Sequence, residues 1–182
     1  MSKDVRLPLP CPRRVLVLGS TGSIGTNCLD VAAHLPDRLQ IVGLSTHGRV
    51  DLLVEQAALF LPRWVAVTDP AAAATLDPAR LPRGCRLLTG PESLTRMAGD
   101  PDVDVVVSAI VGAAGLEGTW AALAAGKTVA FANKETLVMA GPLVTELAAR
   151  HAGRLLPVDR LHSPMLVPPM CATKRRQIGQ FG

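Results

Sequence analysis

The sequence has few aromatic residues, and this scarcity already narrows what the chain binds. Only 3% of its 182 residues are aromatic, and none is tyrosine. Proteins that hold single-stranded nucleic acid stack its bases on aromatic side chains, so we expect no nucleic-acid partner. Long apolar runs are missing too, because none approaches the roughly 18 residues that a membrane-spanning helix needs. We therefore expect no membrane partner either.

Cysteine motifs are also absent, and the excess of positive charge is small. None of the four cysteines lies at CxxC spacing, and they do not form the regular framework of a small secreted protein. We interpret them as reduced thiols of a cytoplasmic protein. Residues 1–14 contain no apolar stretch of the signal-peptide kind, and residues 1–12 are predicted to be a disordered N-terminal extension. The net charge of +4 is spread along the chain until the basic run Lys174-Arg175-Arg176. A spread charge is typical of a solvated surface, and small anionic ligands are the next interpretation.

The sequence does contain short apolar segments that alternate with longer amphipathic ones across residues 13–159. This alternation predicts an α/β fold, a Rossmann-like doubly wound and mainly parallel sheet with helices on both faces. Residues 160–182 show no clear period and are predicted to be an irregular tail. Strands are expected at residues 15–18, 40–44, 64–67, 85–88, 103–109, 128–132 and 154–158, and helices at residues 22–34, 50–61, 71–76, 91–97, 116–125 and 133–150, the last with a kink or restart at Pro142.

A glycine-rich loop follows the first expected strand and opens the first expected helix. It reads Gly19-Ser-Thr-Gly22-Ser-Ile-Gly25. Gly19 and Gly22 at the turn allow a close backbone approach, and Gly25 lets the helix pack on the strand. The free N–H groups at the helix start face an anion such as a pyrophosphate, to which the Thr21 and Ser23 hydroxyls can add donors. The spacing is GxxGxxG rather than the common GxGxxG, so a purely structural turn is the alternative. Position and order favour nucleotide binding.

The end of the second strand distinguishes between the two nicotinamide cofactors. An NAD site places an acidic residue there, on the ribose hydroxyl. Here the sequence reads Ser45-Thr-His-Gly-Arg49, with no carboxylate, while His47 and Arg49 are available. A cation in this position accepts a 2′-phosphate, so NADP is favoured over NAD, with an exposed loop arginine as the alternative.

Four segments in this order resemble the N-terminal, NADPH-binding domain of 1-deoxy-D-xylulose 5-phosphate reductoisomerases. The first is the glycine loop of residues 19–25. The others are Ala109-Ile-Val-Gly-Ala-Ala-Gly-Leu116, Ala132-Asn-Lys-Glu135 and Leu155-Leu-Pro-Val-Asp159. The resemblance covers residues 13–159. It implies an NADPH-dependent, divalent-metal-dependent enzyme that converts 1-deoxy-D-xylulose 5-phosphate to 2-C-methyl-D-erythritol 4-phosphate in non-mevalonate isoprenoid biosynthesis, with a phosphorylated sugar as substrate.

The resemblance also implies roles for individual residues. Lys134 matches the substrate-binding lysine and is the expected catalytic residue, and Asp159 matches the first ligand of Mg²⁺ or Mn²⁺. His47, Gly48 and Arg49 fall where the family contacts the adenosine side of the cofactor. The residues implied to contact NADPH are Thr21, Gly22, Ser23, Ile24, His47, Gly48, Arg49, Asn133 and Glu135.

The sequence departs from the family pattern directly after this aspartate. The family continues Ser-Glu-His-Ser/Asn-Ala, whereas this chain has Arg160 for the serine and Leu161 for the metal-binding glutamate. Leucine offers no oxygen to a hard cation, so we expect an incomplete metal site. His162 and Ser163 match the pattern.

The residues after the departure lead to three hypotheses. Residues 160–182 are interpreted as a remnant of a missing catalytic domain, which in the family also supplies much of the homodimer interface. The first hypothesis is an enzyme of the family, by descent and fold. The second is an NADPH-binding fragment without catalysis, and the third is another NADP-linked dehydrogenase domain. Leu161 favours the second hypothesis for this chain alone, which we expect to be inactive.

Overall fold

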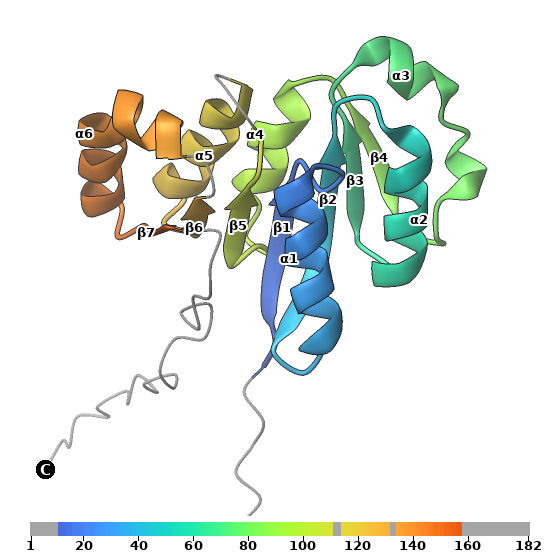
Figure 1. The fold of residues 1–182 in the computed structure, drawn as a ribbon, viewed down its shortest axis with the longest axis horizontal. Helices are drawn as coiled ribbons and strands as arrows, with labels where there is room; N and C mark the ends of the chain where they lie inside the picture. The colour runs from blue at the N-terminus through green and yellow to red at the C-terminus, as the bar shows by residue number, and fades with distance from the viewer. Residues whose placement is uncertain (1–10, 111–113, 132–133, 158–182) are drawn as a thin grey trace, which may run out of the picture.

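The computed structural model describes residues 11–110, 114–131 and 134–157 (Figure 1). Strands and helices alternate along this part of the chain, as the sequence predicts. The strands are β1 (Arg13–Leu18), β2 (Leu39–Thr46), β3 (Trp64–Val67), β4 (Arg86–Thr89), β5 (Val105–Ser108), β6 (Thr128–Phe131) and β7 (Arg154–Pro157). The helices are α1 (Ser23–His34), α2 (Val50–Phe60), α3 (Pro70–Thr75), the 3-10 turn η1 (Pro78–Arg80), α4 (Glu92–Ala98), α5 (Ala114–Ala124) and α6 (Lys134–Arg150).

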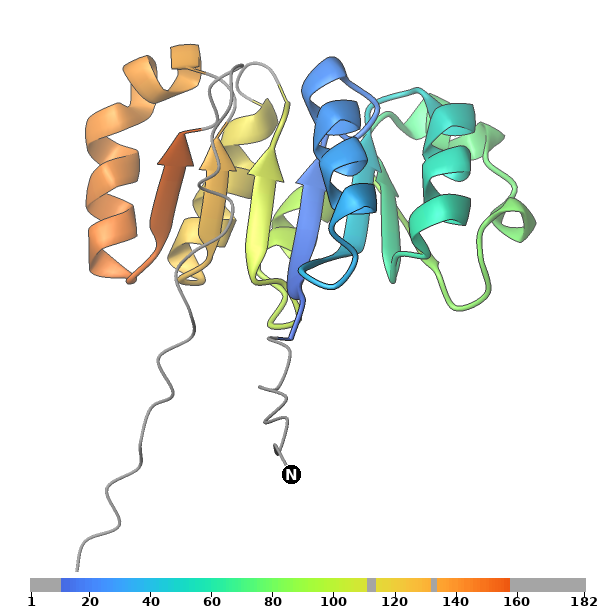
Figure 2. The ribbon, with the colours of Figure 1, turned by 60° about the horizontal axis from the view of Figure 1, so that its bottom comes forward.

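The strands form one parallel sheet in the order β4-β3-β2-β1-β5-β6-β7. The chain therefore runs outward from β1 to β4, returns to β5 beside β1, and continues outward on the other side. All strands point the same way, so their carboxyl ends share one edge (Figure 2). The connections after β1 and β5 diverge at that edge. A crevice for a ligand is expected at such a switch point.

Helices cover both faces of the sheet, which confirms the predicted fold class. Alternate residues of β1 point to opposite faces, as the pleat of a strand requires. Val15 and Val17 belong to the apolar cluster beneath α1, α2 and α3, whereas Leu16 and Leu18 belong to the cluster beneath α4, α5 and α6. Because the inner strands are buried on both sides, their sequences are continuously apolar.

Several predictions about helix ends can be compared directly with the structure. Gly126, after α5, has a φ of 70°, the left-handed conformation typical of a glycine just past a helix. Of the kink or restart predicted at Pro142, the restart is not observed, because α6 passes through this residue as one helix. The 3-10 turn η1 was not expected from the sequence. Within the described residues, no helix is long and apolar enough to cross a membrane.

Two of the cysteines pack against the apolar cluster beneath α1, α2 and α3. These are Cys28 and Cys85, and both are free thiols. Burial raises the pKa of the Cys28 thiol to about 11 and also raises the pKa of Cys85. Both thiols are therefore protonated at neutral pH, which makes them poor nucleophiles.

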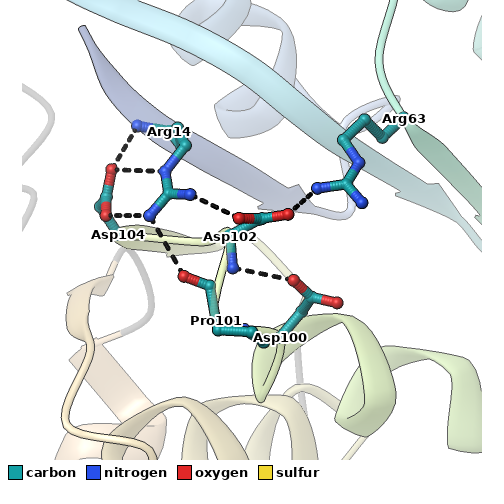
Figure 3. Close-up of polar contacts among 6 residues, drawn as sticks. All are labelled: Arg14, Arg63, Asp100, Pro101, Asp102 and Asp104. Atoms are coloured by element: carbon teal, nitrogen blue, oxygen red, sulfur yellow. Dashed lines mark hydrogen bonds and ion pairs between the residues drawn. The ribbon is translucent and has the colours of Figure 1, made fainter. Parts of the chain in front are cut away.

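An ion-pair cluster joins the amino ends of β1, β3 and β5 (Figure 3). The Arg14 side chain donates to Asp104 through Nε at 3.1 Å and Nη2 at 2.9 Å, and its backbone N–H donates to the same carboxylate at 2.8 Å. Arg14 also contacts Asp102 at 2.7 Å, and Asp102 pairs with Arg63. The cluster lies at the edge of the sheet opposite the switch point, so its role is to hold the sheet together.

Replacing Asp104 with asparagine should lower stability in a pH-dependent way. Burial alone would raise the pKa of Asp104, but hydrogen bonds and positive charge from Arg14 outweigh burial and hold that pKa below its ordinary value. A carboxylate with a lowered pKa stabilises the fold above its unfolded pKa of about 4, and this contribution disappears as the pH falls through its folded pKa.

We expect the D104N variant to melt about 2–4 °C below the wild type at pH 7, a modest change because the pair is partly exposed to solvent. The difference should shrink on acidification below pH ~4. Thermal melts followed by circular dichroism across this range measure it. The control is D37N, because Asp37 is exposed and accepts no hydrogen bond from the described residues. Equal effects of the two substitutions would contradict the assigned role of Arg14.

Candidate nucleotide-binding site

The glycine loop connects β1 to α1 at the switch point of the sheet. Gly19 has a φ of 80°, a conformation that side chains rarely adopt. The Gly22 N–H donates to the Gly19 carbonyl at 3.1 Å and closes the turn. A Cβ on Gly19 would lie 3.0 Å from the Ile110 side chain and 3.1 Å from the Ala109 backbone. The loop after β1 thus lies against the residues that follow β5.

Gly25 allows close packing, although its neighbour differs from the one that we predicted. The sequence suggests that this glycine lets α1 approach the strand. In the structure a Cβ on Gly25 would lie 2.3 Å from the Gly19 carbonyl oxygen and 2.6 Å from Ser20 Cα. The first turn of α1 therefore packs on the backbone of the loop itself. Only a residue without a side chain allows this contact.

The start of α1 presents free backbone donors. The first hydrogen bond of the helix runs from the Thr26 N–H to the Gly22 carbonyl at 2.9 Å. The preceding N–H groups of Ser23, Ile24 and Gly25 have no partner among the described residues, and no side chain caps the helix at Gly22. Free donors and the positive end of the helix dipole together favour an anion at this position. The Ser23 side chain is exposed beside them.

The Thr21 hydroxyl has a different role from the one expected. From the sequence we expected it to be a further donor to the ligand. In the structure Thr21 is buried, and its Oγ1 lies 2.7 Å from Thr46 Oγ1 at the end of β2. The Thr46 hydroxyl also accepts the Arg49 N–H at 3.2 Å. The two hydroxyls therefore tie the loop to β2 and α2.

The residues just after β2 place the cationic side chain of Arg49 beside the glycine loop. His47, Gly48 and Arg49 are exposed between β2 and α2, and Arg49 Nη1 donates to the Thr21 carbonyl at 3.0 Å. His47 Nδ1 lies 3.0 Å from Thr68 Oγ1. The nearest acidic residue along the chain, Asp51, pairs instead with Arg80 at 2.9 Å. The predicted cation thus lies beside the predicted phosphate loop. The carboxylate of Asp69 lies 4.0 Å from a Cβ built on Gly48, but it follows β3 rather than β2 and accepts the Ala71 and Ala72 N–H groups at the start of α3.

Sequence reasoning missed a buried polar network behind the loop. It consists of Ser20 in the loop, Ser45 in β2 and Gln56 in α2, all of which are almost fully buried. The Gly19 N–H donates to Ser45 Oγ at 3.0 Å, and the Ser20 N–H donates to the Ser45 carbonyl at 2.8 Å. One signal was available, because Gln56 interrupts an apolar stripe formed by Leu53, Ala57 and Phe60. A polar residue in such a stripe needs a buried partner.

The other predicted site residues fall at the carboxyl ends of β6 and β7. Asn133 and Asp159 lie outside the described residues. Lys134 and Glu135 are the first residues of α6, directly after β6, and they stand at the same edge of the sheet as the glycine loop. Among the described residues, no group of three or more His, Cys, Asp or Glu side chains is placed to hold a metal ion.

The comparisons with known proteins agree with this geometry. The family model described as 1-deoxy-D-xylulose 5-phosphate reductoisomerase matches residues 15–141. The chain belongs to this family. The reductoisomerase of Methylococcus capsulatus is 50% identical over 152 residues, which are 82% of this chain and 39% of that protein.

Solved reductoisomerase structures have the same fold as this chain. The enzyme of Zymomonas mobilis in complex with NADPH superposes with a TM-score of 0.76 at 38% identity, over 81% of this chain and 39% of that one. A reductoisomerase in complex with NADPH, fosmidomycin and magnesium gives a TM-score of 0.72 at 41% identity, over 80% of this chain and 36% of that one. The chain therefore spans less than two fifths of the length of the relatives that it matches.

Proposed function

We propose that this chain binds NADPH with the pyrophosphate on the glycine loop and the 2′-phosphate beside Arg49. The observation that carries the proposal is the exposed start of α1, where the N–H groups of Ser23 and Ile24 have no partner among the described residues. Gly22 beside them carries no side chain to obstruct a phosphate. The Thr21 backbone adjoins these groups, and its carbonyl holds Arg49 next to them.

His47 and Gly48 complete the adenosine side of the proposed site. Both are exposed at the carboxyl end of β2, where an adenine ring is expected in a fold of this kind. On the nicotinamide side, the family resemblance assigns cofactor contacts to Asn133 and Glu135 and a substrate contact to Lys134. The position of α6 supports these assignments, since it begins at the same edge of the sheet.

We further propose that the chain is the cofactor-binding part of a reductoisomerase acting on 1-deoxy-D-xylulose 5-phosphate. In that reaction NADPH supplies a hydride to an aldehyde intermediate, and a metal held by carboxylates polarises the substrate oxygens. Asp159 is the proposed first metal ligand. Leu161 supplies no oxygen where the family has a glutamate, so we assign no metal-dependent step to this chain.

The test is a titration of the purified 182-residue chain with NADPH, followed by the fluorescence of the reduced nicotinamide. We expect saturable binding, and competition by 2′-AMP, which carries the 2′-phosphate but no pyrophosphate. A chain that is folded by circular dichroism and binds no NADPH would contradict the proposal.

A turnover assay with 1-deoxy-D-xylulose 5-phosphate and Mg²⁺ or Mn²⁺ then distinguishes an enzyme from a binding module. We expect no oxidation of NADPH by this chain alone, and turnover at a rate typical of reductoisomerases would contradict that expectation.

A further inference from the structure

The Gln56 side chain holds one peptide of the glycine loop from behind. Ser20 Oγ donates to Gln56 Oε1 at 2.7 Å, and Gln56 Nε2 donates to the Ser20 carbonyl at 3.0 Å. A carbonyl only accepts hydrogen bonds, so the amide nitrogen must face it, and this fixes the orientation of the amide. The two bonds clamp both the side chain and the main chain of Ser20.

The clamp is buried and continuous with the end of β2. Ser20 is fully buried and Gln56 is 7% exposed, so water cannot replace either bond at low cost. Ser45, also fully buried, binds the loop from the other side through its hydroxyl and its carbonyl. No buried side-chain nitrogen or oxygen atom in the described part of the chain lacks a partner. Removing Gln56 would therefore leave the buried Ser20 carbonyl without its donor, whereas the Ser20 hydroxyl would keep the Ser45 carbonyl as its acceptor at 3.2 Å.

The clamped residue is flanked in the sequence by residues that shape the proposed binding site. Ser20 lies between Gly19, which makes the turn, and Thr21, whose carbonyl holds Arg49. The Gly25 contact fixes the loop from the front, because α1 rests on the Gly19 carbonyl and on Ser20. The loop is thus fixed on two sides, and only its outward donors are left for a ligand. Donors held rigidly before binding lose little entropy when an anion arrives.

We propose that Gln56 is a positioning residue, which sets the backbone donors of the glycine loop at the pyrophosphate subsite without touching the ligand. This inference rests on the proposed NADPH site. The effect of Gln56 on binding is therefore limited to one part of the ligand, the pyrophosphate. Loss of the clamp should weaken ligands that contain the pyrophosphate. Ligands held only at Arg49 should be unaffected, because the contact between the Thr21 and Thr46 hydroxyls holds Thr21 independently of Gln56.

The experiment compares two ligands on the full chain, with NADPH as the pyrophosphate probe and 2′-AMP as the probe without it. The variants are Gln56→Met, which removes both bonds at similar volume, and Ser20→Ala, which removes the hydroxyl together with its contacts to Gln56 Oε1 and to the Ser45 carbonyl. Leu53→Ala is the control, because the apolar side chain of Leu53 is fully buried on α2 about one turn earlier. Each variant is measured below its own melting temperature, determined by circular dichroism.

For Gln56→Met we expect the Kd for NADPH to rise about tenfold, the order of effect expected for one orphaned buried polar group, here the Ser20 carbonyl, while the Kd for 2′-AMP stays within about twofold. Ser20→Ala should show the same pattern more weakly, and the double variant should be no worse than Gln56→Met alone. Leu53→Ala should melt earlier and bind both ligands as the wild type does. Equal weakening of both ligands, or unchanged NADPH binding in Gln56→Met and Ser20→Ala, would overturn the positioning role alone. A wild-type chain that does not bind NADPH would overturn the proposed function and this role together.

Discussion

Replacement of Gly25 by alanine is expected to abolish measurable NADPH binding and to destabilise the chain. The new Cβ would lie 2.3 Å from the Gly19 carbonyl oxygen and 2.7 Å from the Ser20 carbonyl carbon. Both contacts are with backbone atoms, which cannot rotate away as a flexible side chain could. Overpacking of this kind costs about 3 kcal/mol in the free energy of unfolding. Because a shift of about 1 Å can cost 100-fold in a positioned site, we expect the Kd for NADPH to rise by at least ~100-fold.

Two glycine variants show whether the backbone contact is the cause. Gly141→Ala adds the same methyl group in α6, where no atom of the described residues lies within 4 Å of the new Cβ, and should leave binding and stability unchanged or slightly improved. Gly22→Ala places its Cβ 3.4 Å from the Gly19 carbonyl, an ordinary contact, and should keep most of the stability. Titrations and thermal melts of the three variants measure the difference. A G25A chain that binds NADPH as tightly as G141A would refute the argument.

The sequence was informative about the fold because its signals are local. Apolar strands alternate with amphipathic helices, and each crossover between parallel strands follows from that order. The glycine loop could be placed for the same reason, since its meaning depends only on the strand before it and the helix after it. The cation at Arg49 could be placed from its distance along the chain after those glycines.

Contacts between distant residues could not be read in this way. The pairing of Arg14 with Asp104 joins residues that are 90 positions apart, and no local pattern announces it. The Thr21 hydroxyl was assigned to the ligand, because the sequence does not show that Thr46 lies beside it. Gly25 was assigned to the strand for a similar reason. In each case the outcome depends on which strand ends meet at the switch point.

The contact between Arg49 and the loop leads to the second prediction of large effect, which concerns cofactor preference. Arg49 is exposed and reaches the Thr21 carbonyl from the end of β2, so its guanidinium stands between the phosphate loop and the adenosine side. A guanidinium donates paired hydrogen bonds to a phosphate and is attracted by its negative charge. A ribose hydroxyl carries no charge and offers the guanidinium much less. NADPH and NADH differ only in that 2′-phosphate. The proposed site therefore owes its preference for NADPH to this one side chain.

We expect Arg49→Met to raise the Kd for NADPH about 10- to 100-fold and to leave the Kd for NADH within about threefold, since charged hydrogen bonds contribute about 1.5–3 kcal/mol each. For Arg49→Lys we expect a Kd for NADPH between those of the wild type and Arg49→Met, because lysine keeps the charge but loses the paired geometry. The control is Arg38→Met, which removes an equal charge just before β2, at the opposite end of that strand. Parallel titrations with NADPH and NADH at fixed salt measure all four chains. If Arg49→Met weakened both cofactors equally, the arginine would act on the shared pyrophosphate or on the fold, and the preference for NADPH would have to come from another residue.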